Sequence, residues 1–144
     1  MRNGQSLERL LYISESRIES LQTWPIVAEI IAGAQIRNEE LGLTGALLFT
    51  GTYFAQILEG PTASITRLMR SLGNDIRHTN IVIVDRSFIT GRKFSDWKMA
   101  YHGPSQFVSR HVARLLNSPS QSEHQRATEW LTELAHEFSG APAA

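Results

Sequence analysis

Residues 43–59 read LTGALLFTGTYFAQILE, two apolar runs on either side of the pair Gly51-Thr52. Glycine favours tight turns, so this pattern predicts a β-hairpin with strands over 43–50 and 53–59. The second run holds Gln56 among apolar neighbours. A buried amide without hydrogen-bond partners costs about 1–3 kcal/mol, so the fold must offer Gln56 partners from the protein or from a ligand.

Predicted strands and helices alternate on both sides of this hairpin. Runs of β-type apolar residues predict strands over 9–14, 80–85 and 97–101, and apolar positions at helical spacing predict helices over 25–41, 61–73, 105–116 and 122–138. The first six elements follow the order β-α-β-β-α-β, the split β-α-β arrangement of ferredoxin-like folds. We therefore predict an α+β fold: a ferredoxin-like βαββαβ sandwich with an added fifth strand and two C-terminal helices.

The ferredoxin-like topology places Tyr12 next to Gln56. Right-handed crossovers are expected to bring the strands over 9–14 and 53–59 side by side at the sheet centre, parallel to each other. The two crossover helices would cover one face of the sheet, and the two C-terminal helices would cover the other. The Tyr12 hydroxyl is then one candidate partner for the Gln56 amide, and a polar heteroaromatic ligand beside both residues is another.

Composition and missing motifs exclude several classes of function. The chain has 144 residues, of which 42% are apolar and 19% charged, values typical of one soluble domain. Its 14 basic and 14 acidic residues cancel, which argues against nucleic-acid binding. The sequence contains no cysteine, no phosphate-binding loop or nucleophile elbow, and no histidine pair at metal-binding spacing.

The N-terminus and the apolar stretches bear on localisation. Residues 1–6 are polar and lack the apolar core of a signal peptide. The longest apolar stretch, 26–34, is interrupted by Glu29 and is too short to span a bilayer. We therefore expect a soluble, cytoplasmic protein without a membrane partner.

Several polar side chains are placed where they could reach a ligand between the two crossover helices. Asn38 lies at the end of the first helix, and Asp75, Arg77 and His78 follow the second. Arg77 and His78 could face a phosphate or a ring carbonyl. Each residue also has an ordinary local interpretation: Asn38 and Asp75 suit helix ends, and Arg77 with His78 suits a solvated pair.

Four segments together resemble the signature segments of BLUF domains, the sensors of blue light using FAD. They are LYIS at 11–14, LTGALL at 43–48, FAQILEG at 54–60 and WKM at 97–99. The resemblance covers about 7–101. It implies a flavin-binding photosensory domain over 1–102, followed by a C-terminal helical extension over 103–144, as in the short, stand-alone members of that family.

The resemblance implies a non-covalent FAD between the two crossover helices, with the photochemistry at two residues. Tyr12 would donate an electron and a proton to the excited flavin. Gln56 would bridge the tyrosine hydroxyl and the N5/O4 edge of the flavin. Trp97 and Met99 would lie near Gln56 and relay its rearrangement outward.

The resemblance also implies a set of residues that hold the flavin. Asn38 would bind the ring at O4 and N3, and Arg77 would reach the O2 side, with Asp75 and His78 close by. Arg37 stands where histidine or asparagine often packs against the ring, and its guanidinium could stack there instead.

The function implied is that of a blue-light photoreceptor with no catalytic turnover, which signals to a separate partner protein and commonly self-associates. Two alternatives remain open. One is a small hydrolase similar to acylphosphatases, with Asn38 and Arg77 as catalytic groups, although the phosphate-cradling arginine after the first strand is missing. The other is a regulatory dimerisation module that binds no flavin. The colour of the purified protein separates these possibilities.

Overall fold

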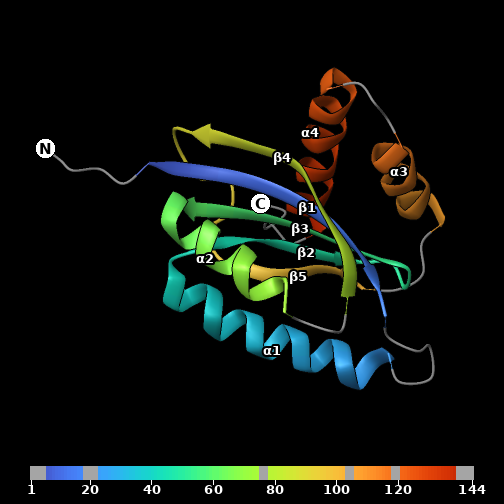
Figure 1. Ribbon diagram of the computed structural model, residues 1–144, viewed down its shortest axis with the longest axis horizontal. Helices are drawn as coiled ribbons and strands as arrows, with labels where there is room; N and C mark the ends of the chain where they lie inside the picture. The colour runs from blue at the N-terminus through green and yellow to red at the C-terminus, as the bar shows by residue number, and fades with distance from the viewer. Residues whose placement is uncertain (1–5, 18–22, 75–77, 103–105, 118–120, 139–144) are drawn as a thin grey trace, which may run out of the picture.

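The computed structural model describes residues 6–17, 23–74, 78–102, 106–117 and 121–138 (Figure 1). Within this part of the chain, the predicted order of strands and helices is confirmed. The elements are β1 (Leu7–Ser16), α1 (Thr23–Leu41), β2 (Thr44–Phe49), β3 (Tyr53–Pro61), α2 (Thr62–Leu72), β4 (His78–Ile89), β5 (Trp97–His102), α3 (Gln106–Asn117) and α4 (Gln121–Phe138).

The five strands form one sheet in the order β4-β1-β3-β2-β5. The predicted neighbours β1 and β3 lie side by side at its centre, but they run antiparallel, with Tyr12 opposite Gln56. The prediction of a parallel pair was wrong because α1 connects β1 to β2, and those two strands share a direction. The tight hairpin then folds β3 back between them, antiparallel to both.

Strand β4 is longer than its apolar run suggested. It pairs with β1 from Ser16 opposite His78 to Leu7 opposite Ile89, so polar residues after 84 also join the ladder. His78, expected in a loop after α2, is therefore the first residue of an edge strand. At the opposite edge, β5 pairs with β2 in parallel.

Helices cover both faces of the sheet, as predicted. Successive side chains of β1 point to opposite faces, and each face has its own hydrophobic core. Leu10 and Tyr12 belong to a core with α1 and α2, whereas Leu11 and Ile13 belong to a second core with α3 and α4. Figure 1 shows α1 and α2 on one side of the sheet and α4 on the other. None of the helices in the described ranges is long and apolar enough to cross a membrane.

Gly45 near the start of β2 permits a close approach of two strands. Its φ of +145° is one that side chains rarely adopt, and a Cβ built there would lie 1.9 Å from the carbonyl oxygen of Ile57. Its N–H donates to the carbonyl oxygen of Asp96 at 2.9 Å, just before β5. Glycine at this position therefore lets β2 lie close to β3.

Replacing Gly45 with alanine is expected to lower the free energy of unfolding by about 3 kcal/mol or more, because it adds both a backbone clash and dihedral strain. Urea denaturation followed by circular dichroism measures the change. Gly91→Ala is the matched control, since a Cβ at Gly91 meets nothing within 4 Å. Equal stabilities of the two variants would contradict this account of Gly45.

Candidate functional site

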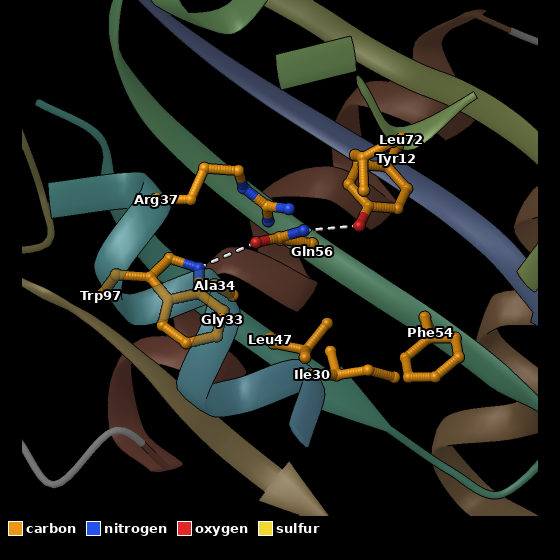
Figure 2. A pocket seen from close by; sticks show the side chains of 10 residues that line it. All are labelled: Tyr12, Ile30, Gly33, Ala34, Arg37, Leu47, Phe54, Gln56, Leu72 and Trp97. Atoms are coloured by element: carbon orange, nitrogen blue, oxygen red, sulfur yellow. Dashed lines mark hydrogen bonds between the residues drawn. The ribbon is translucent and has the colours of Figure 1, made fainter. Parts of the chain in front are cut away.

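The side chain of Gln56 is held between Tyr12 and Trp97 (Figure 2). Its Nε2 donates to the Tyr12 hydroxyl oxygen at 2.5 Å, and its Oε1 accepts from the indole Nε1–H of Trp97 at 2.8 Å. Gln56 and Tyr12 are each 2% exposed and Trp97 is 8% exposed. The buried Gln56 amide thus has two hydrogen-bond partners within the protein, the phenol of Tyr12 and the indole of Trp97.

Sheet register explains why these three side chains meet. Tyr12 and Gln56 are directly opposite on β1 and β3, so their side chains share a face. Trp97 begins β5, two strands away, and pairs with Gly45 of β2. Trp97 and Gln56 line the same cavity, and on that face the indole reaches across β2 to the amide.

The Gln56 amide retains hydrogen-bonding capacity. A primary amide has two N–H donors and a carbonyl oxygen with two lone pairs. The bonds to Tyr12 and Trp97 use one donor and one lone pair. A second donor and a second lone pair are therefore available to a ligand that lies against this side chain.

Such a ligand has a cavity to occupy. An opening with an empty volume of about 590 Å³, part of it open to solvent, lies over Gln56 between α1 and the sheet. The walls are mostly apolar, and they comprise Tyr12, Ile30, Gly33, Ala34, Arg37, Leu47, Phe54, Gln56, Leu72 and Trp97.

Asn38 is a buried polar residue whose side-chain amide finds no partner among the described residues. Its side chain is 0% exposed, and neither its Oδ1 nor its Nδ2 has a hydrogen-bond partner. It lies one helical turn beyond Ala34 of the cavity wall, although it does not line the cavity itself. An orphaned amide costs about 1–3 kcal/mol, so Asn38 is a candidate to bind a ligand that reaches past Ala34 along α1.

The remaining predicted site residues fall into two groups. Arg37 lines the cavity from α1. Met99 is the backbone partner of Leu47, itself the partner of Gln56, but its side chain lies outside the described part of the structure. The side chain of His78 and all of Asp75 and Arg77 also lie outside it. The roles expected of these residues stay predictions.

Sequence reasoning missed the apolar walls of the cavity. The wall from α1 is formed by Ile30, Gly33, Ala34 and Arg37, which recur at intervals of one helical turn. A helical stripe that contains a glycine and an alanine, with an arginine at its end, is a signal for a helix that leaves room for a flat ligand. A Cβ at Gly33 would meet nothing within 4 Å, in keeping with open space along this face.

The described lining of the cavity is mostly apolar. Tyr12 and Arg37 are the ionisable residues in that lining. Across the described residues, no group of histidines and carboxylates could hold a metal ion. Glu8, whose pKa is lowered by the hydrogen-bonded guanidinium of Arg86, belongs to a structural ion pair between β1 and β4.

Comparison with known proteins gives the family. The model of the family described as BLUF, sensors of blue-light using FAD, matches residues 7–100. Photoactivated adenylate cyclase subunit beta of Euglena gracilis is 32% identical over 94 residues, which make up 65% of this chain and 11% of that protein. The blue light- and temperature-regulated antirepressor BluF of Escherichia coli K12 is 37% identical over 68 residues, or 47% of this chain and 17% of that protein.

Solved structures agree with the sequence comparison. The dark-state structure of BlrB, a BLUF protein, superposes with a TM-score of 0.70 at 26% identity, covering 94% of this chain and 98% of that one. This chain spans only a small part of the two longer relatives, so their whole-protein activities do not follow from the match. The family model, by contrast, matches well over half of the chain, and the chain therefore belongs to the BLUF family of blue-light sensors.

Proposed function

We propose that the protein binds FAD non-covalently in the cavity over Gln56 and responds to blue light through Tyr12. The observation that carries this proposal is the buried Gln56 amide, held between a phenol and an indole with its remaining capacity available to a ligand. The residues fit a flavin: apolar walls suit a flat ring system, and the orphaned Asn38 amide suits an edge with both a donor and an acceptor.

Bound FAD would supply absorption of blue light and an acceptor for one electron. Tyr12 would give up an electron and its phenolic proton and later take both back, so no net chemistry remains. In the present arrangement the Gln56 NH₂ group donates to the tyrosine oxygen, so Gln56 would accept the phenolic proton once its carbonyl oxygen faces that hydroxyl, and would pass it on through its amide. Asn38 and Arg37 would hold the ring from α1, and Arg77, with Asp75 and His78, would hold its O2 side.

The two neighbours of Gln56 respond differently to a half-turn of its amide, which exchanges the positions of C=O and NH₂. A tyrosine hydroxyl both donates and accepts, so Tyr12 can bond to either end. The indole of Trp97 can only donate, so it loses its acceptor when the NH₂ group turns toward it. Trp97 is therefore the group that must move, and with Met99 on the same strand it would relay the rearrangement.

We propose that this rearrangement is read by a separate partner protein, with no catalytic turnover in this chain. The segment 103–144 would form the helical extension that follows the photosensory domain of 1–102. Some relatives place the same module in a cyclase, as the name of the Euglena protein states. A cytoplasmic location would suit a sensor with these properties.

We further propose that the protein self-associates through β4, with a second copy as the occupant. This edge strand exposes 43% of Val82, 47% of Ile83 and 72% of Phe88. Its segment 81–84 is uncharged and lacks the lysine or proline that commonly protects an edge. Antiparallel pairing of β4 with itself about a twofold axis would cover this segment on both copies at once.

The rearranged Gln56 amide would bond more strongly to the flavin and shift its absorption reversibly to the red. Tyr12→Phe and Gln56→Ala are each expected to retain FAD but to lose this red shift, because each removes one end of the proton path. Absorption spectra before and after blue light measure this. Tyr53→Phe is the matched control, since Tyr53 lies on β3 but does not line the cavity. A normal light response in either of the first two variants would refute the assigned roles.

Asn38→Leu is expected to have opposite effects on stability and on flavin binding. In flavin-free protein it removes an unsatisfied buried amide, so the free energy of unfolding should rise by about 1 kcal/mol. Affinity for FAD should fall about tenfold or more, because the ring loses that partner. Titration of refolded protein with FAD measures the latter, and Gln35→Leu on the exposed side of α1 is the control. Unchanged FAD affinity would mean that Asn38 does not hold the cofactor.

Val82→Lys is expected to convert the oligomer to a monomer, since a charge on an edge strand opposes pairing. Light scattering coupled to size-exclusion chromatography measures the mass. Ile36→Lys is the control, because Ile36 is 63% exposed but lies on α1. A wild-type monomer, or an oligomer unaffected by lysine at Val82, would exclude β4 as the interface.

A further inference from the structure

Strand β3 carries a second buried polar residue, Glu59, three positions after Gln56 and on the opposite face. Ala55 and Ile57, which share the face of Glu59 on β3, belong to the core under α3 and α4, whereas Gln56 faces the cavity. The Glu59 side chain is 0% exposed. A carboxylate is stable in such a place only if its oxygens are well supplied with donors.

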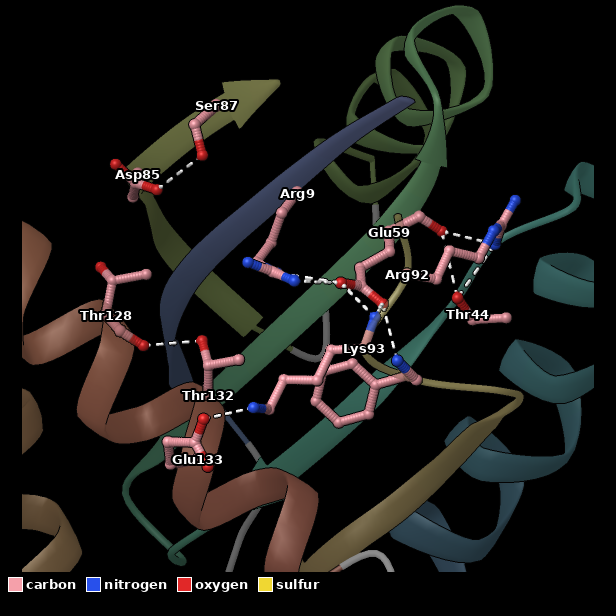
Figure 3. Close-up of polar contacts among 11 residues, drawn as sticks. Arg9, Thr44, Glu59, Asp85, Ser87, Arg92, Lys93, Thr128, Thr132 and Glu133 are labelled. Carbon is pink, nitrogen blue, oxygen red and sulfur yellow. Dashed lines mark hydrogen bonds and ion pairs between the residues drawn. The ribbon is translucent and has the colours of Figure 1, made fainter. Parts of the chain in front are cut away.

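The donors come from two different parts of the chain (Figure 3). Arg9 of β1 donates from Nε at 2.9 Å and from Nη2 at 2.5 Å, both to Oε2. The backbone N–H groups of Lys93 and Phe94 donate to Oε1 at 2.9 and 2.8 Å. Two consecutive amides on one oxygen form a small anion-binding nest, so the carboxylate fixes the backbone of the loop between β4 and β5.

This loop leads directly to Trp97. Phe94 precedes the tryptophan by three residues and is 4% exposed, so the segment between them is short and anchored at its start. At its other end, Asp96 accepts the N–H of Gly45 at 2.9 Å. The position from which Trp97 reaches Gln56 therefore depends on the loop that Glu59 holds.

The same loop contacts α4. The Lys93 ammonium pairs with the Glu133 carboxylate, an ion pair that lowers the pKa of Glu133. The Phe94 ring packs edge-on against His136 of α4, with ring centroids 5.8 Å apart. Two consecutive loop residues thus use their backbone for Glu59 and their side chains for α4.

We propose that Glu59 is a positioning residue for the light response. By holding the Lys93 and Phe94 amides, its carboxylate sets where Trp97 meets Gln56 and couples a displacement of Trp97 to α4. Strand β3 then carries both residues that act on Trp97. Gln56 contacts the indole on the cavity face, and Glu59 holds the loop before Trp97 on the face covered by α4. The coupling to light rests on the proposed photochemistry, whereas the hold on the loop does not.

Glu59→Gln tests the proposal, because it keeps the shape of the side chain but removes its charge. A neutral amide offers the loop N–H groups one weaker acceptor oxygen, and its NH₂ group cannot accept from them. In the dark, hydrogen exchange at Lys93 and Phe94 should accelerate about tenfold or more, since two charge-assisted hydrogen bonds weaken. In FAD-loaded protein the reversible red shift should persist with an altered recovery rate. The light-minus-dark exchange difference over α4 should be lost.

Glu8→Gln is the matched control. Glu8 is also buried, at 5% exposure, and pairs with an arginine on a neighbouring strand, but within the described residues its bonds are to the side chains of Arg86 and Thr62. A general loss of stability would affect both variants, whereas only Glu59→Gln should change the recovery rate and the response of α4. If Glu59→Gln does not fold, Glu59→Asp retains the charge and shortens the reach, and the same readouts apply.

The outcomes separate this proposal from the proposed function. Wild-type dark exchange at Lys93 and Phe94 in the Glu59 variant would refute the hold on the loop. A normal recovery rate and a normal α4 response in that variant would refute the coupling. If wild-type protein bound FAD without any reversible shift, the proposed photochemistry and the coupling would both fail, while the dark exchange would still decide whether Glu59 holds the loop.

Discussion

The site depends on one constraint: a carboxamide buried in the middle of a β-sheet must have hydrogen-bond partners. Gln56 meets it with a tyrosine hydroxyl and an indole N–H from the strands β1 and β5. One of these partners can exchange donor and acceptor roles and the other cannot. That asymmetry makes the arrangement suitable for a switch, because reversing the amide leaves one neighbour satisfied and displaces the other.

The two faces of β3 carry different polar residues in different surroundings. On one face, Gln56 and its neighbours border a cavity with apolar walls, and the orphaned amide of Asn38 lies one helical turn beyond the wall residue Ala34. On the other face, Glu59 gathers Arg9 and two loop amides beneath α4. Because successive strand residues alternate between faces, a segment of four residues brings a cavity-facing amide and a helix-facing carboxylate into one strand.

Much of this arrangement was predictable from local patterns, and the errors have identifiable causes. Adjacency of β1 and β3 followed from the order of elements, but their antiparallel direction follows from where the hairpin inserts β3. The extent of β4 was underestimated because pairing with β1 overrides the polar composition of its second half. Glu59 looked like a strand end in the sequence, and only its burial shows that it is a centre of contacts.

The sequence by itself determined the element order, the two-sided burial of β1, the hairpin, and the need of Gln56 for partners, because periodicity and the cost of burying an amide are local properties. Tertiary structure alone decided which groups satisfy that need. Trp97 is 41 residues from Gln56 and reaches it because β5 pairs with β2, which lies next to β3. The loop amides meet Glu59 for the same reason: contacts between distant segments are set by strand order and register, which no local pattern encodes.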